Sequence, residues 1–493
     1  MQKFIIYQLF VRNMGQRNWQ PGGSLQENGC GKMSDITQDY LDNLVINLNI
    51  GAIWYTGLIA HSTTSSFDGF NADNPNIVKG KAGSPYAIRD YYDIAPELAL
   101  KPTERMAEFK SLLERTHKAG LKFIIDFVPN HVARSYYSST DNFTDSNFYP
   151  LDGQLVLPVH ILGADSYVEN PAFATGNNCF STQPSIYDWY DTIKLNYDNR
   201  STWNKMLNIL LFWAEQGVDG FRCDMVEMVR SEFFEWAIQQ VKLLYPDCLF
   251  IAEVYDKFHY RQYFEAGFDY MYDKSGFYDA LRSVCAGHQP AAWLTDEWQF
   301  LGDIQPKMLN FLENHDEQRL ASDFFLGDAM HSFAPLAVSM LFNKAPFMIY
   351  SGQEYGEKGM QQEGYSGLDG RSSIFDYCSL SYYRNYTQLQ AYLFDRYHHL
   401  TCLATSDLFA KGECYDLMYA NPLSAIFDPS ALFAFMRGYK GQLALVVANF
   451  SSTRGVIKIS IPEDAYRYFS SSRIASFEEY IIVEPYDYTI LIA

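Results

Sequence analysis

The chain has 493 residues, enough for a large domain with one or two accessory units. Its apolar fraction of 48% and charged fraction of 19% are ordinary for a globular protein and exclude the disordered and fibrous classes. The net charge of −20 argues against nucleic acid and anionic membrane surfaces as partners, because the field of the protein would repel phosphate groups, and it leaves neutral ligands open.

Eight short apolar segments predict strands. The first, residues 4–11, is a nearly continuous apolar run, which is typical of a strand buried on both faces. Helical spacing of apolar residues between several of these segments predicts crossover helices, and the alternation favours parallel strands in a closed (β/α)8 TIM barrel. An open doubly wound sheet is the alternative, but no GxGxxG follows the first strand. The other predicted strands are residues 52–55, 121–128, 220–224, 249–252, 267–272, 308–312 and 346–350.

Two stretches interrupt the alternation. Between residues 132 and 202 no helical period holds and polar residues dominate, so we expect an inserted subdomain after the third strand. After Ser406 short alternating segments at 432–437, 443–449, 455–461 and 488–492 predict a C-terminal antiparallel β-sandwich domain. The predicted barrel therefore comprises residues 1–131 and 203–405, the inserted subdomain 132–202, and the C-terminal domain 406–493.

The cysteine pattern and the apolar segments predict the redox state of the thiols and the compartment of the protein. The eight cysteines are scattered without a CxxC pair or metal-ligand spacing, so we expect mostly buried, reduced thiols. The start of the chain has no small-residue cleavage site, and no apolar run approaches the length of a membrane span. These features predict a cytoplasmic protein.

The segment 220–224 places Arg222 two residues before Asp224, so both side chains leave the same face of a strand. A guanidinium beside a carboxylate keeps the carboxylate ionised and fixes its orientation, as a nucleophile at neutral pH requires. A structural ion pair at a strand end is the alternative for this segment taken alone.

Acidic and imidazole residues recur where predicted strands end. In a β/α barrel these carboxyl ends converge on one mouth, where active sites are built. Each residue alone could be a strand-end cap, but all of them at one topological position indicate a site. Three carboxylates without metal-ligand spacing suit glycoside hydrolysis, in which one is the nucleophile and another is an acid with a raised pKa. The residues are Asp126, His131, Asp224, Glu253, His315 and Asp316.

The sequence resembles the α-amylase family, glycoside hydrolase family 13, through nearly its whole length. The matching segments are Asp-Phe-Val-Pro-Asn-His at 126–131, Gly-Phe-Arg-Cys-Asp at 220–224, Ala-Glu-Val at 252–254 and Phe-Leu-Glu-Asn-His-Asp at 311–316, with a further match at 192–196 in the insertion. The resemblance implies that Asp224 is the nucleophile, Glu253 the acid/base and Asp316 the third acid. It also implies substrate-binding roles for Tyr86, which would stack on the sugar, and for Asp126, His131, Arg222 and His315.

The sequence also departs from the family pattern. Glu227 and Met228 stand where many α-amylases have Lys and His, and Ser84 stands where a sugar-binding His often precedes the stacking Tyr. We expect altered contacts on the leaving-group side and a preference for maltooligosaccharides over intact starch. Asn130 matches a residue that binds structural calcium in some members, but no other ligand can be placed.

The leading hypothesis is a retaining glycoside hydrolase that cleaves α-glucosidic bonds, of the α-1,4 type, in starch-derived oligosaccharides without a cofactor for the chemistry. A transglycosylase or sugar isomerase with the same three acids is an alternative, because both pass through one glycosyl-enzyme. A catalytically inactive binding or scaffold protein on the same barrel is a third reading. The sequence leaves the oligomeric state open.

Overall fold

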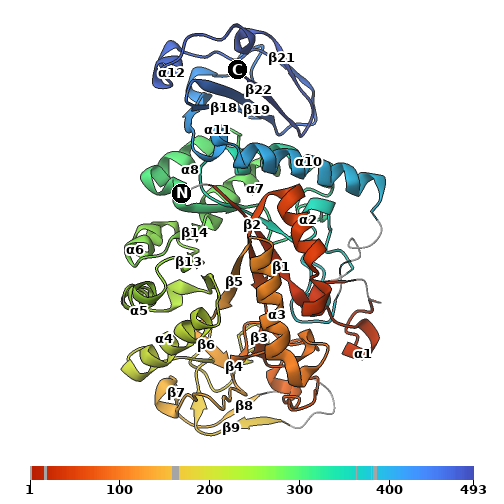
Figure 1. The fold of residues 1–493 in the computed structure, drawn as a ribbon, viewed down its shortest axis with the longest axis vertical. Coiled ribbons are helices and arrows are strands. Elements are labelled where there is room, and N and C mark those ends of the chain that lie inside the picture. Colours follow the sequence, from red (N-terminus) through yellow and green to blue (C-terminus); the bar gives the residue numbers. More distant parts are fainter. Residues whose placement is uncertain (1–2, 16–18, 158–165, 362, 379, 381–385) are drawn as a thin grey trace.

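The computed structural model describes residues 3–15, 19–157, 166–361, 363–378, 380 and 386–493. The eight predicted barrel strands are all present and form a closed parallel barrel in the order β1-β16-β15-β14-β13-β12-β5-β2. The C-terminal part of the chain lies at one end of the molecule, next to the barrel, and the inserted segment lies at the other (Figure 1). The strands are β1 Ile5–Phe10, β2 Ile50–Thr56, β5 Lys122–Phe127, β12 Gly220–Cys223, β13 Leu249–Ala252, β14 Tyr270–Tyr272, β15 Met308–Phe311 and β16 Phe347–Tyr350.

Burial of the barrel strands on both faces explains their continuous apolar sequences. Every residue of β1 is buried. Alternate residues point inward, where Ile6, Trp54 and Ile124 join one interior cluster, or outward, where Tyr7 and Ile53 pack under the helices. The larger helices that follow the strands are α2 Gln38–Leu48, α3 Arg105–Lys118, α4 Arg200–Glu215, α5 Ser231–Leu244, α6 Tyr260–Glu265, α7 Asp279–Cys285, α8 Trp293–Leu301, α9 Phe333–Leu341 and α10 Gln388–Thr405.

Long connections follow the second and third barrel strands at their carboxyl ends. After β2, strand β3 (Ile59–His61) pairs with β4 (Ile88–Ile94). After β5, strand β6 (His131–Ala133) pairs with β11 (Thr192–Lys194), and the segment between them forms two further small antiparallel pairs. These pairs are β7 Pro150–Leu151 with β10 Ala172–Phe173, and β8 Leu155–Leu157 with β9 Tyr167–Glu169.

The C-terminal part of the chain is antiparallel β structure, as predicted. Strands β17 (Glu413–Asp416), β18 (Leu432–Tyr439), β19 (Gln442–Asn449) and β22 (Tyr488–Ile492) form one sheet. The predicted strand at 455–461 is shorter, β20 (Gly455–Ile457), and pairs with β21 (Ile481–Val483). The remaining short helices are α1 Leu25–Asn28, α11 Asp407–Ala410 and α12 Glu463–Tyr468.

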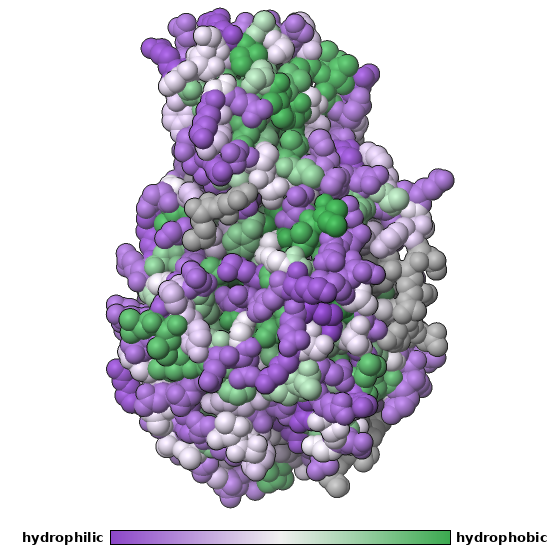
Figure 2. Space-filling view, in the orientation of Figure 1, coloured by the Kyte–Doolittle hydropathy of each residue, from purple (hydrophilic) through white to green (hydrophobic). Residues whose placement is uncertain are grey.

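The face of the molecule drawn in Figure 2 is mainly polar. On the face in Figure 2, hydrophilic residues predominate and apolar residues form scattered groups, one of which lies over the C-terminal part at the top. Within the described ranges, none of the helices is long and apolar enough to cross a membrane. The eight cysteines are unpaired thiols in the structure, four of them buried.

Candidate active site

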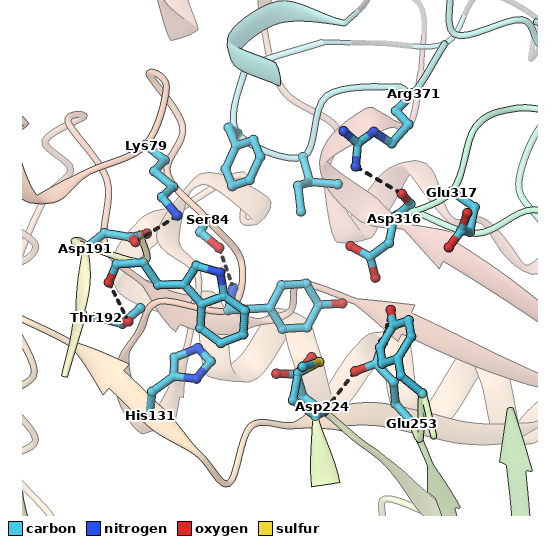
Figure 3. A pocket seen from close by; sticks show the side chains of 16 residues that line it. Lys79, Ser84, His131, Asp191, Thr192, Asp224, Glu253, Asp316, Glu317 and Arg371 are labelled. Carbon is cyan, nitrogen blue, oxygen red and sulfur yellow. Dashed lines mark hydrogen bonds and ion pairs between the residues drawn. The ribbon is translucent and has the colours of Figure 1, made fainter. Parts of the chain in front are cut away.

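The predicted site residues meet at the mouth of the barrel, where the carboxyl ends of the strands converge. Asp224, Glu253 and Asp316 follow β12, β13 and β15, and each of them lines one cavity of about 540 Å³ (Figure 3). Tyr86 and His131 also line this cavity. Asp126, Arg222, His315 and Asn130 are buried at the same end of the barrel and contact the lining residues or their neighbours.

Arg222 is the electrostatic centre of this site. Its guanidinium is completely buried, and three aromatic rings surround it, those of Trp54, Tyr86 and Tyr272. Nη1 donates to Oδ1 of Asp224 at 2.7 Å and to Oδ1 of Asp126 at 3.3 Å, while Nη2 forms an ion pair with Oε1 of Glu253 at 2.5 Å. One cation therefore orients three carboxylates, as the Arg-x-Asp spacing predicted for Asp224.

The backbone after β12 holds the second oxygen of Glu253. The N–H of Met225 donates to Oε2 of Glu253 at 2.8 Å, and the hydroxyl of Tyr255 donates to Oε1 at 3.3 Å. Met225 takes up a left-handed conformation, with φ of 44°, which is strained for a residue with a side chain. Met225 directly follows Asp224, so this one turn places both the Asp224 carboxylate and the N–H group that binds Glu253.

The acids differ in their affinity for protons. Burial raises the pKa of Asp224 well above its usual range, and the nearby carboxylates of Glu253, Asp316 and Asp126 raise it further, against the opposing effect of Arg222. Burial would also raise the pKa of Asp316, but His315, Arg222 and Arg371 outweigh it and lower that pKa. The raised pKa of Asp224 differs from the expectation that Arg222 keeps this carboxylate ionised, because burial and three neighbouring carboxylates outweigh one guanidinium.

Residues from the barrel interior fix His315. The side-chain amide of Gln8, on β1, lies 2.7 Å from Nδ1 of His315 and donates to Oγ1 of Thr56 at 3.0 Å. On its other edge, Nε2 of His315 lies 2.5 Å from the hydroxyl of Tyr86 and 3.0 Å from Oδ2 of Asp316. The rings of Tyr86 and His315 are stacked, with centroids 5.2 Å apart. His315 therefore couples the tyrosine of one loop to the acid of another.

His131 is a neutral donor or acceptor at this site. Burial lowers the pKa of its imidazole to about 3, and the ammonium groups of Lys194 and Lys79 add to the effect. Its ring lies 5.2 Å from that of Trp189, which also lines the cavity. An uncharged imidazole beside an aromatic face is suited to a neutral, hydroxylated ligand.

The surroundings of Asn130 do not fit a calcium ion. The amide oxygen, which would be the ligand, accepts a hydrogen bond at 2.8 Å from the ammonium of Lys194, a side chain that is largely buried. The amide nitrogen donates to the carbonyl of Gly176 at 2.8 Å. Calcium requires six to eight oxygen ligands, and the described residues contain no cluster of three or more His, Cys, Asp or Glu side chains that could hold a metal. A fixed cation already occupies the position beside this oxygen.

Glu227 takes a structural position that the sequence did not suggest. Its carboxylate accepts hydrogen bonds from the backbone N–H groups of Tyr255, at 2.7 Å, and Asp256, at 3.1 Å, and its Oε1 lies 2.9 Å from Nδ1 of His259. The carboxylate therefore holds the loop after β13, which carries the Tyr255 hydroxyl to Glu253.

Several cavity residues carry no signal that sequence reasoning could use. Trp189 and Asp191 come from the inserted segment, Lys79 from the connection after β3, and Arg371 from the segment after β16. Of these residues, only Trp189 and Asp191 lie close in sequence to a segment that resembles the family, residues 192–196. The loops that bring these side chains to the cavity have no periodic pattern, so their positions depend on tertiary contacts.

Comparison with known proteins identifies the family. The model of the α-amylase catalytic domain matches residues 24–389. The chain belongs to the α-amylase family. This family member is 26% identical over 375 residues to alpha-amylase MalA of Haloarcula japonica, covering 73% of this chain and 45% of the relative. It is 22% identical over 407 residues to a cyclomaltodextrin glucanotransferase of Bacillus sp. strain 1011, covering 75% of this chain and 52% of that protein.

A solved structure shares the fold over the full chain. The cyclic α-maltosyl-(1→6)-maltose hydrolase of Arthrobacter globiformis superimposes with a TM-score of 0.70 at 17% identity, covering 100% of this chain and 98% of the other. By contrast, this family member spans only about half the length of the two relatives compared above. Their activities are therefore carried over only as part of a proposal.

Proposed function

We propose that this α-amylase family member is a retaining glycoside hydrolase that cleaves α-1,4-glucosidic bonds in starch-derived oligosaccharides. The observation that carries the proposal is the contact of one guanidinium with both candidate groups. Adjacent amino groups of Arg222 hold Asp224 at 2.7 Å and Glu253 at 2.5 Å. Retaining enzymes keep their two carboxyl groups about 5 to 5.5 Å apart, whereas inverting enzymes leave a wider gap for water. The shared guanidinium supports the closer arrangement.

In this mechanism Asp224 attacks the anomeric carbon while Glu253 protonates the departing oxygen. The C1–O bond breaks as the bond from C1 to Asp224 forms, and the proton of Glu253 leaves with the alcohol. Glu253, now ionised, then removes a proton from water, which displaces Asp224 and regenerates both groups. Burial and the carboxylate of Glu253 raise the pKa of Asp224, and Arg222 opposes that rise, so the guanidinium favours the ionised Asp224 that the attack requires.

The remaining cavity residues have roles in holding the sugar. Tyr86 presents an aromatic face, His131 a neutral imidazole, and Asp316 a carboxylate that is held by His315. The cavity contains both apolar surface and converging polar groups, which is the composition that suits a sugar with apolar faces and hydroxyl edges. We propose no metal or cofactor for the chemical steps.

Transfer to a second sugar is the alternative outcome of the same chemistry, and the match to a cyclomaltodextrin glucanotransferase favours testing it. The purified protein is incubated with maltoheptaose, and products are followed by chromatography and by proton NMR during the first turnovers. Shorter maltooligosaccharides that appear first as the α-anomer support the proposal. Products longer than the substrate would indicate transglycosylation, and initial β-anomer or no reaction would contradict it.

A further inference from the structure

Side chains from three separate segments meet at one side of the cavity. We call Lys79, Tyr190, Asp191, Tyr365 and Phe375 the end wall. Lys79 follows β3, Tyr190 and Asp191 precede β11 in the inserted segment, and Tyr365 and Phe375 follow β16. Lys79, Asp191 and Phe375 line the cavity itself.

Direct contacts join these segments to one another. Nζ of Lys79 forms an ion pair with Oδ1 of Asp191 at 3.3 Å, and both side chains are nearly buried, with exposures of 12% and 2%. The hydroxyls of Tyr190 and Tyr365 form a hydrogen bond of 2.9 Å, and the ring of Tyr365 packs edge-on against Phe375 at 5.3 Å. The wall is therefore continuous from the first long connection, through the insertion, to the segment after the last strand.

A backbone contact completes the wall between its first and last segments. The N–H of Ala82 donates to the carbonyl of Phe375 at 3.0 Å. Gly80 comes so close to this carbonyl that a Cβ there would lie 2.2 Å from its oxygen. A close backbone approach of this kind leaves no channel for a polysaccharide chain between the two segments.

The position of the wall is set by the strand order. Its segments follow β16, β2 and β5, which together with β1 form one side of the barrel, and β13, which carries Glu253, lies opposite β1. Figure 3 shows Lys79 and Asp191 across the cavity from Glu253. The wall thus faces the candidate acid over the sugar-binding space.

If the proposed function is correct, the geometry of a 1,4-linked chain shows which end of the bound substrate faces the wall. The bond that Glu253 protonates is at C1, and in a pyranose ring C4 lies across the ring from C1. The chain continues toward its non-reducing end through O4, which points away from Glu253 and toward the wall. We infer that the end wall stops the chain there, so that the protein removes short units from non-reducing ends and does not cut within long chains.

Two aryl maltoheptaosides test this inference, one with a free non-reducing end and one blocked there by a 4,6-ethylidene group. The wild type should hydrolyse the free substrate and should cleave the blocked one on the order of 100-fold more slowly. The reason is that the wall leaves no room for the ethylidene group when the terminal sugar is bound for cleavage. A free substrate shortened stepwise from its non-reducing end gives the size of the unit removed. Hydrolysis of both substrates at similar rates would overturn the inference and leave the proposed function intact, whereas hydrolysis of neither would contradict the proposed function itself.

Variants then assign the effect to the wall. Lys79→Ala with Tyr365→Ala removes both side-chain links, and Tyr365 is 44% exposed, so its truncation leaves no core cavity. The double variant should raise the rate ratio of blocked to free substrate by roughly ten-fold. Tyr480→Ala, at a 63% exposed tyrosine in the C-terminal part, is the matched control and should leave the ratio unchanged. An unchanged ratio in the double variant would show that the wall does not set the mode of attack.

Discussion

A buried ion pair beneath the cavity gives a stability prediction of defined size. Arg12 and Glu97 are each 1% exposed, and Oε1 of Glu97 lies 3.3 Å from Nη2 of Arg12 and 2.9 Å from Nε2 of His61. Nη1 of Arg12 donates to the carbonyls of Gly83, at 3.1 Å, and Ile374, at 2.8 Å. The pair therefore ties the loop that carries Tyr86 to a segment that lines the cavity.

The magnitude follows from the pKa of Glu97. Burial alone would raise this pKa, but His61 and Arg12 lower it from 4.5 to about 2. A pKa that is depressed in the folded state adds stability above the unfolded value, and the stability is lost as the pH falls through the folded value. The shift corresponds to about 3 kcal/mol of folding free energy at neutral pH. Glu97→Gln keeps the shape of the side chain and an acceptor oxygen but loses this contribution.

Calorimetry measures the effect on the intact chain. If the chain unfolds as one unit, a loss of about 3 kcal/mol lowers Tm at pH 7 by about 3 °C. The difference between wild type and variant should narrow as the pH falls from 4.5 toward 2, because Glu97 of the unfolded wild type is protonated first and the folded carboxylate only near pH 2. Asp303→Asn, which breaks the exposed ion pair with Arg261, is the control and should leave Tm unchanged. Equal Tm values for Glu97→Gln and wild type at pH 7, or a difference that does not narrow as the pH falls from 4.5 toward 2, would refute the reasoning.

Three further predictions concern the site. Asp224→Asn and Glu253→Gln should each lower kcat at least about 100-fold with an unchanged circular dichroism spectrum, because each step loses its reacting group; near-wild-type turnover would remove the residue from its assigned role. Arg222→Gln should move the acid limb of the kcat/KM profile to higher pH, since the guanidinium lowers the pKa of Asp224; an unmoved limb would show that another group titrates there. Chelation with EDTA should leave the wild-type Tm unchanged because Lys194 lies beside Asn130, and a lower Tm restored by calcium would contradict this account.

The barrel and the acids were predictable from sequence because both follow regular rules. Apolar runs locate the strands, and the carboxyl ends of parallel strands must share one mouth, which brings Asp224, Glu253 and Asp316 together. The match of residues 24–389 to the family model confirms the family and its fold. The sequence also predicted the orienting contact between Arg222 and Asp224, since residues two apart on a strand share a face.

The walls of the cavity were not predictable, because they depend on contacts between loops. The backbone hydrogen bonds of Glu227 within the loop after β13 could not be read from its position in the sequence. Lys194 lies inside a recognised segment, yet its contact with Asn130 depends on the pairing of β6 with β11. Such contacts join residues 28 to 64 positions apart, beyond the reach of periodicity or spacing.

The central claim is that Asp224 becomes covalently bonded to the sugar. A 5-fluoro-α-glucosyl fluoride forms a glycosyl-enzyme that hydrolyses slowly, so the adduct can be located by digestion and mass spectrometry. The account predicts one added fluoroglucosyl group per chain, on the peptide that contains Asp224. An adduct on any other residue, or inactivation of Asp224→Asn at the wild-type rate, would contradict it.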